Sequence, residues 1–171
     1  LVIDPVLIAT REYRLTDGSG AAALTEELIP RATVVTPNIP EAEELSGLRI
    51  TDAASMEEVA YWFLDQGASA VVLKGGHAEF RKGVDLFLDR EGVRLLSGNV
   101  YAFPDVHGSG CCFASAVAAY VALGYPVFSA VEQAKVFIDG AMRYAVEYAP
   151  GRFTMNPNWR EHQEYPVLLE K

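Results

Sequence analysis

Residues 106–112 combine two glycines with two thiols, in the order Val-His-Gly-Ser-Gly-Cys-Cys. Residues 109–123 are rich in Ala, Ser and Val and contain neither Pro nor Asp, which predicts a helix that begins at or just after Ser109. Gly108 and Gly110 have no Cβ, so a ligand can approach the backbone closely. The first turn of a helix leaves N–H groups unpaired at the positive end of its dipole, and such a helix start binds anions.

The first cysteine of this stretch is a candidate for chemistry. The helix dipole favours the thiolate of a cysteine in the first turn, so Cys111 is suited to accept a proton or to hold a reacting group. Composition alone is equally consistent with a flexible loop that Ser109 caps. Cys111 and Cys112 are alternatively small packing residues, and this is the favoured interpretation of Cys112.

Two charged residues follow apolar runs that read as buried strands. Asp4 comes after the run 1–3 and precedes Pro5, and open α/β sheets bind ligands at the carboxyl ends of their strands. Asp4 is equally well interpreted as a turn residue that caps its own backbone. Lys74 follows the run 69–73 and precedes two glycines, which suits a phosphate contact; the alternative is a surface lysine in a glycine turn.

A second carboxylate and an amide follow a third apolar run. The β-branched run 32–36, which ends in Thr36, is followed by Pro37 and Asn38, and Glu41 lies in the first turn of the next predicted helix. Asn38 and Glu41 therefore converge on one site, and two oxygen ligands suit Mg²⁺, which prefers one or two carboxylates with waters and phosphate oxygens. The alternative is that Glu41 only favours the helix dipole, with its acidic neighbours as solvated surface.

The elements that position these residues alternate between strand and helix. This alternation predicts an α/β fold with a mostly parallel central sheet and helices on both faces. A loop over 11–20 contains Gly18 and Gly20, and Thr51 or Ser55 is predicted to cap a helix that ends at Gly67. The other predicted elements are a helix over 21–29 ended by Pro30, a hairpin of strands 83–89 and 93–96, a strand over 100–103 and helices over 109–123 and 129–148.

Composition narrows the class of protein. The chain has 171 residues, of which 50% are hydrophobic, so it can bury one sizeable core in one domain. The net charge of -9 argues against nucleic-acid binding, and no apolar stretch approaches the about 20 residues of a membrane span. The two cysteines are adjacent, which suggests reduced thiols in the cytoplasm. The three histidines are far apart in sequence, and no local metal-ligand motif appears.

Four motifs together carry a resemblance that spans residues 1–148. They are Asp-Pro-Val at 4–6, Thr-Pro-Asn-Ile-Pro-Glu-Ala-Glu at 36–43, Leu-Lys-Gly-Gly-His at 73–77 and His-Gly-Ser-Gly-Cys at 107–111. In this order and spacing, they resemble the hydroxymethylpyrimidine and hydroxymethylpyrimidine phosphate kinases of thiamin synthesis, within the ribokinase-like superfamily. The set is specific, although each motif alone is weak.

The resemblance implies ATP-dependent phosphorylation of a small pyrimidine, with Mg²⁺, and makes a homodimer plausible. Cys111 occupies the position that most of the superfamily fills with a catalytic Asp, and a Cys there is typical of the pyrimidine kinases. A pyridoxal-type kinase, which shares the fold, is less favoured because that group usually carries Asp at this position. The resemblance assigns the remaining residues as follows: Gly108, Ser109 and Gly110 form the anion hole, Asp4 and Glu41 organise Mg²⁺ and phosphates with Thr36 and Asn38 beside them, and Lys74 contacts the nucleotide phosphates.

The chain also departs from the family pattern. It lacks the region that precedes the Asp-Pro-Val motif in the family, so we expect either a piece of a longer protein or a shortened homologue. Residues 1–150 are then the carboxy-terminal part of a kinase domain, and 151–171 are expected to form an irregular tail. Val106 and Ser109 stand where Thr is common, and the loop from Thr10 to Tyr13 is unusual. A non-catalytic nucleotide-binding fragment is the alternative from another class of protein.

Overall fold

The computed structural model describes residues 1–7, 14–76, 80, 82–99 and 106–161. The chain forms two compact units, residues 1–97 and 98–171. Three of the sequence predictions lie outside the described residues: the unusual loop from Thr10 to Tyr13, His77, and the strand over 100–103. Among the described residues, no helix combines the length and apolar character needed to cross a membrane.

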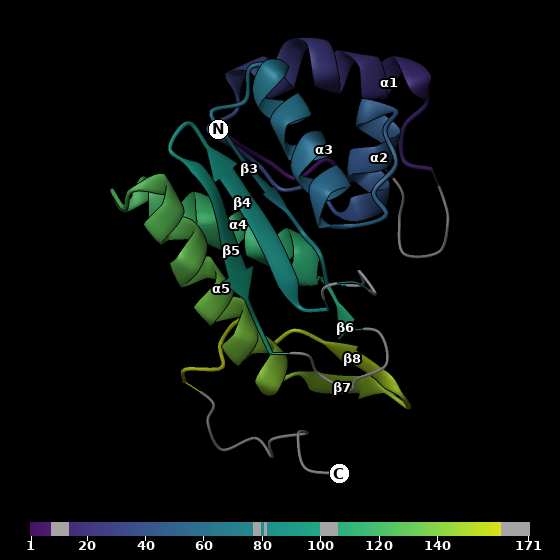
Figure 1. Ribbon diagram of the computed structural model, residues 1–171. Coiled ribbons are helices and arrows are strands. Elements are labelled where there is room, and N and C mark those ends of the chain that lie inside the picture. The colour runs from purple at the N-terminus through teal and green to yellow at the C-terminus, as the bar shows by residue number, and fades with distance from the viewer. Residues whose placement is uncertain (8–13, 77–79, 81, 100–105, 162–171) are drawn as a thin grey trace. The chain divides into compact units, whose positions relative to one another are not determined.

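The first unit is built on a sheet of five strands (Figure 1). Its first three strands are parallel, and the last two form an antiparallel hairpin beside them, as the sequence predicts. β3 is fully buried because all four of its residues are apolar. The spatial order is β1 (Val2–Ile3), β2 (Val34–Val35), β3 (Ala70–Leu73), β4 (Val84–Asp89) and β5 (Gly92–Ser97).

The first helix begins earlier than predicted. Gly18 and Gly20 lie within α1 (Gly18–Ala23) and not in a loop, because the carboxylate of Asp17 accepts the N–H groups of Ser19 and Gly20 and so caps the helix. The chain continues through a π-helical turn, η1 (Leu24–Leu28), into a 3₁₀ turn, η2 (Ile29–Arg31). Pro30 lies inside η2 and does not end the helix before it, because proline fits the start of a helical turn.

Two further helices complete the first unit, α2 (Ile39–Ser46) and α3 (Ala53–Asp65). Asp52 caps α3, so the prediction of Thr51 or Ser55 as the cap was wrong. Ser55 is instead the second member of a capping box: its hydroxyl accepts the N–H of Asp52, and Asp52 accepts the N–H of Ser55. The helix ends at Asp65, two residues before the predicted Gly67, whose φ of 102° favours glycine just after the helix.

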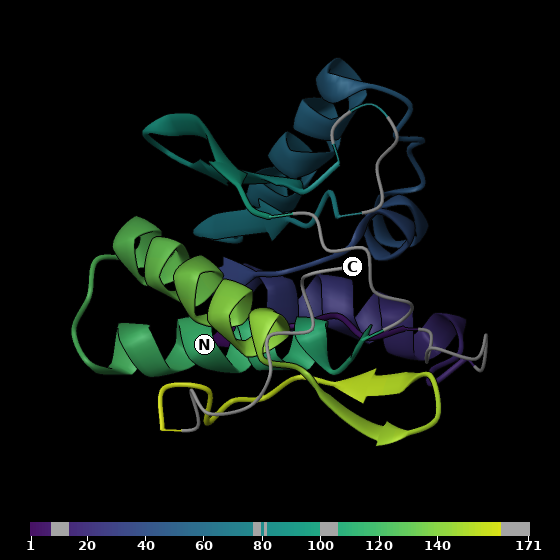
Figure 2. The same ribbon diagram turned by 90° about the horizontal axis from the view of Figure 1, so that it is seen from below.

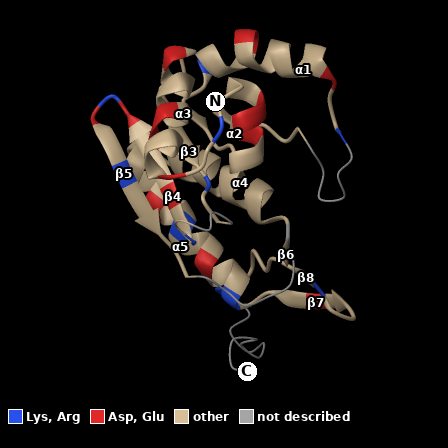
Figure 3. Ribbon diagram, turned by 45° about the vertical axis from the view of Figure 1, so that its right-hand side comes forward, with Lys and Arg blue, Asp and Glu red and all other residues tan. Residues whose placement is uncertain are grey.

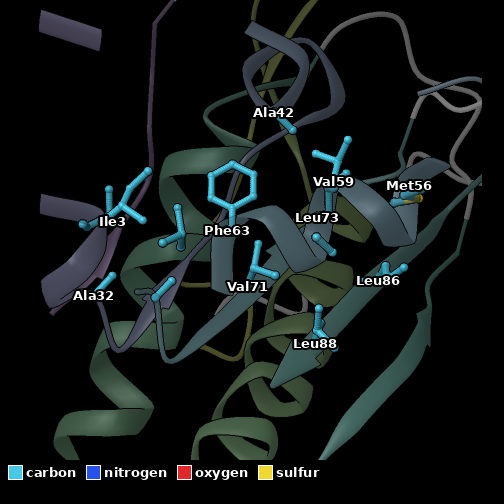
Figure 4. Close-up of a cluster of buried hydrophobic side chains, with 14 of the residues drawn as sticks. Ile3, Ala32, Ala42, Met56, Val59, Phe63, Val71, Leu73, Leu86 and Leu88 are labelled. Carbon is cyan, nitrogen blue, oxygen red and sulfur yellow. The ribbon is translucent and has the colours of Figure 1, made fainter. Parts of the chain in front are cut away.

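The core of the first unit lies between α3 and the sheet (Figure 4). Phe63 of α3 is fully buried and points among apolar side chains of the strands, including Val71. The apolar residues of α3 recur at helical spacing, so one face of the helix is buried while Tyr61 stays exposed. This packing anchors β3, whose carboxyl end carries Lys74.

The second unit contains two long helices and a small sheet (Figure 2). α4 (Ser109–Ala122) and α5 (Val127–Arg143) pack side by side. The sheet has the order β6 (Val106–His107), β8 (Arg152–Thr154) and β7 (Val146–Ala149).

The carboxy-terminal part of the second unit corrects two predictions. The helix predicted over 129–148 ends at Arg143, because the following residues pair with β8 as strand β7. The segment after 150, predicted to be irregular, contains β8, which also pairs in parallel with β6. Backbone pairing with neighbouring strands thus outweighs the helical pattern at 144–148.

Trp159 packs directly over a glycine of α5. A Cβ built on Gly140 would lie 2.3 Å from Cε2 of the Trp159 ring, so no larger residue fits without moving the indole. The same ring stacks on Tyr144, with centroids 6.1 Å apart and an interplanar angle of 7°. This contact ties the end of the described chain to α5.

Replacing Gly140 by Ala should therefore destabilise the protein by about 1–3 kcal/mol, because the indole must leave its place. Urea unfolding measures the loss, and a shift of the tryptophan emission reports the displacement of Trp159. Gly18→Ala is the matched control, because nothing lies within 4 Å of a Cβ built there. Its free energy of unfolding should stay within about 1 kcal/mol of that of wild type. Equal stability of the Gly140 variant and wild type, with unchanged emission, would contradict the packing.

Candidate functional site

The three parallel strands of the first unit end at one edge of the sheet. Ile3 pairs with Val35, so the residues after β1 and β2 are neighbours. Val35 pairs with Val71, and the residue after β3 is level with Asn38. These residues are Asp4, Thr36 and Lys74. Three predicted site residues that are far apart in sequence therefore follow neighbouring parallel strands at one edge of the sheet.

Two hydrogen bonds converge on one oxygen of Asp4. Lys74 donates from Nζ to Oδ1 of Asp4 at 3.0 Å, and Thr36 donates from Oγ1 to the same oxygen at 3.1 Å. The side chains of Lys74 and Asp4 are 18% and 13% exposed, and Thr36 is fully buried. Asp4 is therefore no isolated turn residue; it is the acceptor at the centre of this cluster.

Asn38 and Glu41 form a capping box at the start of α2. Oδ1 of Asn38 accepts the N–H of Glu41 at 2.9 Å, and Oε2 of Glu41 accepts the N–H of Asn38 at 2.8 Å. Asn38 also forms a parallel bridge to Lys74, whose own N–H donates to the carbonyl of Pro37 at 2.8 Å. The capping box therefore lies beside the end of the strand that carries Lys74, and part of its hydrogen-bonding capacity serves the helix.

The Glu41 carboxyl is 6% exposed, and its environment changes its acidity. Burial raises the pKa of Glu41, while the hydrogen bond from the Asn38 N–H and the positive charge of Lys74 oppose the rise. The nearby charge of Asp4 acts in the same direction as burial. A cation placed next to Glu41 would favour the ionised form of its carboxyl group and so oppose the effect of burial on its pKa.

The helix α2 carries further acidic residues, coloured red in Figure 3, and their carboxylates have other partners. Glu43 accepts from Arg49 at 2.9 Å and from the N–H of Ile50 at 2.7 Å. Glu44 pairs with Arg14 at 2.7 Å. Both are partly buried, unlike the solvated surface of the alternative interpretation. Their pairing leaves Glu41 as the acidic residue of α2 beside the strand ends.

The donor set suits a hard divalent cation. Asp4 and Glu41 supply carboxylate oxygens, and Asn38 lies next to them with an amide. In the part of the chain that the structure describes, no group of three or more His, Cys, Asp or Glu side chains is placed to hold a metal. Two carboxylates without a full protein cage fit Mg²⁺, which completes its shell with water and phosphate oxygens.

Asp85 supports the cluster, and the sequence analysis missed it. Asp85 of β4 is 6% exposed, and its Oδ1 accepts the N–H of Gly75 at 3.0 Å. A Cβ on Gly75 would lie 2.1 Å from the carbonyl oxygen of Val84, so only glycine allows this approach. The backbone that carries Lys74 is thereby fixed from the neighbouring strand. The available signal was an acidic residue within an otherwise apolar strand pattern.

The predicted glycine-rich helix start is present in the second unit. Gly108 is the N-cap residue of α4, with a φ of 90° that favours glycine, and no side chain among the described residues caps the helix. Ser109 is the first helical residue, so the interpretation of Ser109 as the cap was wrong. Within the part of the chain that the structure describes, no side chain accepts the N–H groups of Ser109, Gly110 and Cys111, so this first turn can face an anion.

The two thiols differ in environment. Cys111 is exposed in the first turn of α4, where a ligand can reach it, and Cys112 is half-buried. Burial raises the pKa of Cys112, and the neighbouring Cys111 raises it further. A protonated, half-buried thiol agrees with the interpretation of Cys112 as a packing residue, and it leaves Cys111 as the accessible sulfur.

Comparison with known proteins identifies relatives over nearly the whole chain. A family model described as phosphomethylpyrimidine kinase matches residues 1–156. A hydroxymethylpyrimidine/phosphomethylpyrimidine kinase of Staphylococcus aureus is 37% identical over 159 residues, which cover 91% of this chain and 57% of the relative. A kinase of the same description from Rhizobium meliloti is 41% identical over 155 residues, covering 88% and 58%. The chain thus spans less than two thirds of the length of these curated relatives.

Solved structures give the same fold. The pyridoxal kinase of Staphylococcus aureus in complex with ADP superposes with a TM-score of 0.84 at 32% identity, over 93% of this chain and 58% of that chain. A phosphomethylpyrimidine kinase of Clostridium difficile gives a TM-score of 0.70 at 34% identity, over 82% and 56%. The α/β fold is therefore ribokinase-like, as the resemblance implied.

Removing the Asp85 carboxylate tests its support of the Lys74 backbone. Asp85→Ala should lower the free energy of unfolding by about 1–3 kcal/mol, because the N–H of Gly75 is left unpaired in a buried place. Asp85→Asn keeps an acceptor oxygen and should lose less. Chemical denaturation of both variants measures the free energy of unfolding. Equal losses in the two variants would show that the hydrogen bond to Gly75 does not account for the destabilisation.

The Glu41 carboxyl makes a pH-dependent contribution to stability. Because its pKa is raised on folding, the folded protein binds more protons than the unfolded chain between the ordinary value of 4.5 and the higher folded value. This contribution is fully present below 4.5 and is lost as the pH rises through the folded value. Glu41→Gln still accepts the N–H of Asn38 but does not titrate.

The stability of the Glu41→Gln variant relative to wild type should therefore improve as the pH rises through that window. Urea unfolding of both proteins at a series of pH values measures the difference directly. A difference that stays constant with pH, or one that changes with the opposite sign, would contradict the raised pKa.

Proposed function

The chain belongs to the phosphomethylpyrimidine kinase family, and we propose that it serves ATP-dependent phosphorylation of hydroxymethylpyrimidine or its monophosphate in thiamin biosynthesis. The observation that carries this proposal is the cluster of Asp4, Thr36 and Lys74 at the strand ends, within a chain that matches the family over residues 1–156. Because the chain spans less than two thirds of its relatives, residues 1–150 are assigned to part of a longer kinase domain.

The strand-end cluster is assigned to the nucleotide and its metal ion. Asp4 and Glu41 would hold Mg²⁺, which would neutralise the charge of the triphosphate, and Thr36 orients the Asp4 carboxylate. Lys74 contacts the phosphates, because an ammonium group on a flexible stem follows the charge of a phosphate. Asn38 fixes Glu41 through the capping box. Positioning and charge neutralisation of this kind supply most of the catalysis of phosphoryl transfer.

The start of α4 is assigned to the transferred group. The open N–H groups after Gly108, at Ser109 and Gly110, stabilise the phosphoryl group as charge builds on its oxygens. The substrate hydroxyl attacks the γ-phosphorus, the bond from that phosphorus to the bridging oxygen breaks, and ADP leaves. Cys111 accepts the proton of the attacking hydroxyl, which requires the accessible thiol to be deprotonated.

A pyridoxal kinase is the second candidate, and a structural observation favours it. The pyridoxal kinases of Staphylococcus aureus and Bacillus subtilis superpose with TM-scores of 0.84 and 0.82. Against it stands Cys111, because the resemblance places Asp at this position in pyridoxal-type kinases. A nucleotide-binding fragment without turnover is the alternative from a different class. The family assignment also suggests a cytoplasmic homodimer.

Turnover with defined acceptors separates these candidates. We expect a coupled ADP-release assay on the purified chain to respond to hydroxymethylpyrimidine or its monophosphate more strongly than to pyridoxal. Preference for pyridoxal would establish the second candidate. Nucleotide binding without turnover on any of the three would indicate a binding fragment.

Replacement of the two cysteines tests the proton acceptor. Cys111→Ala should lower turnover by about a hundredfold while leaving the nucleotide affinity nearly unchanged, because general-base catalysis is lost and the phosphate contacts remain. Cys112→Ala is the matched control and should retain turnover. The ADP-release assay measures both variants, and unchanged turnover of the Cys111 variant would remove this thiol from the mechanism.

A further inference from the structure

The ammonium group of Lys74 pairs with the Asp4 carboxylate, which the proposed function assigns to a metal ion. Nζ of Lys74 lies 3.0 Å from Oδ1 of Asp4, and both side chains are less than one fifth exposed. Thr36 donates to the same oxygen at 3.1 Å. With its cation and its hydroxyl donor in place, this oxygen of Asp4 is already neutralised before any ligand arrives.

We propose that Lys74 is an internal counter-ion of Asp4 that gives way when a divalent cation binds together with nucleotide, so that the site excludes the free cation. This inference rests on the proposed function, in which Asp4 and Glu41 hold Mg²⁺ next to the phosphates. It adds that Lys74 exchanges one partner for another: it pairs with the Asp4 carboxylate in the free protein and with a phosphate in the complex.

The charges of the cluster explain why the exchange needs nucleotide. Asp4 and Glu41 carry at most two negative charges, and Lys74 carries one positive charge. A divalent cation added to this set would leave an excess of positive charge in a poorly hydrated place, with Lys74 and the cation repelling each other. The negative phosphates of a nucleotide remove that excess and give the ammonium group a new acceptor.

The backbone around Lys74 confines the exchange to its side chain. The N–H of Lys74 donates to the carbonyl of Pro37 at 2.8 Å, and the next N–H, of Gly75, donates to Asp85 at 3.0 Å. Both bonds hold the main chain where it is. The four-carbon stem of the lysine is flexible, so Nζ can move from carboxylate to phosphate without a change of the strand.

The exchange makes the binding of cation and nucleotide cooperative. Nucleotide raises the affinity for the divalent cation because it draws Lys74 away from Asp4, and by thermodynamic reciprocity the cation raises the affinity for nucleotide by the same factor. A neutral residue at position 74 removes the competitor. The affinity for the free cation should then rise, and the coupling should fall.

Mn²⁺ binding to the full chain tests this, with the free ion measured by electron paramagnetic resonance in the absence and presence of the ATP analogue AMP-PCP. Wild type should bind Mn²⁺ weakly alone and at least about tenfold more tightly with AMP-PCP. Lys74→Met should bind Mn²⁺ alone about tenfold more tightly than wild type, with a smaller gain from AMP-PCP. Arg49→Met, which removes the exposed ion pair to Glu43, is the matched control and should bind Mn²⁺ as wild type does.

Two results would overturn the exchange: a wild type that binds AMP-PCP without any change in its Mn²⁺ affinity, or a Lys74→Met variant that binds free Mn²⁺ no better than wild type. Lys74→Gln, which still donates to Asp4 but carries no charge, replaces the Met variant if that protein does not fold. Failure of wild type to bind AMP-PCP even with Mn²⁺ would count against the proposed function instead. In that case the comparison of wild type with the variant in Mn²⁺ alone still decides the exchange.

Discussion

The ion pair between Lys74 and Asp4 is the interaction on which the candidate site depends. It joins residues 70 positions apart in sequence, at the ends of two strands that are separated in the sheet by β2. Removal of either partner would leave an uncompensated, partly buried charge, which is costly, whereas a charged ligand can take the place of either one. The pair therefore links two strand ends, and it is also the interaction that a charged ligand would replace.

The sequence predicted much of this arrangement because its signals are local. Apolar runs identified β1, β2 and β3. Asp4 and Lys74 directly follow two of these runs, and Thr36 is the last residue of the third. Parallel strands end at the same edge of a sheet, so convergence of these residues followed from the pattern of elements. Gly108 and the small residues that follow it likewise predicted where α4 begins.

The features that the sequence did not predict depend on partners distant in sequence or on competing hydrogen bonds. Asp85 supports Gly75 across two antiparallel strands, and no local pattern specifies which backbone group a buried carboxylate accepts. The end of α5 at Arg143 is set by the pairing of β7 with β8, which overrides a helical pattern. The start of α1 was misplaced because the capping carboxylate of Asp17 outweighed the low helix propensity of the glycines after it.

The central claim is that the strand-end carboxylates hold the metal ion of a bound nucleotide. The most direct measurement is a crystal structure of the chain with Mn²⁺ and AMP-PCP, with the metal located by its anomalous scattering. The account predicts an anomalous peak at coordination distance from the carboxylates of Asp4 and Glu41, with Nζ of Lys74 on a phosphate oxygen. A metal bound to AMP-PCP away from both carboxylates, with Lys74 still paired to Asp4, would contradict it.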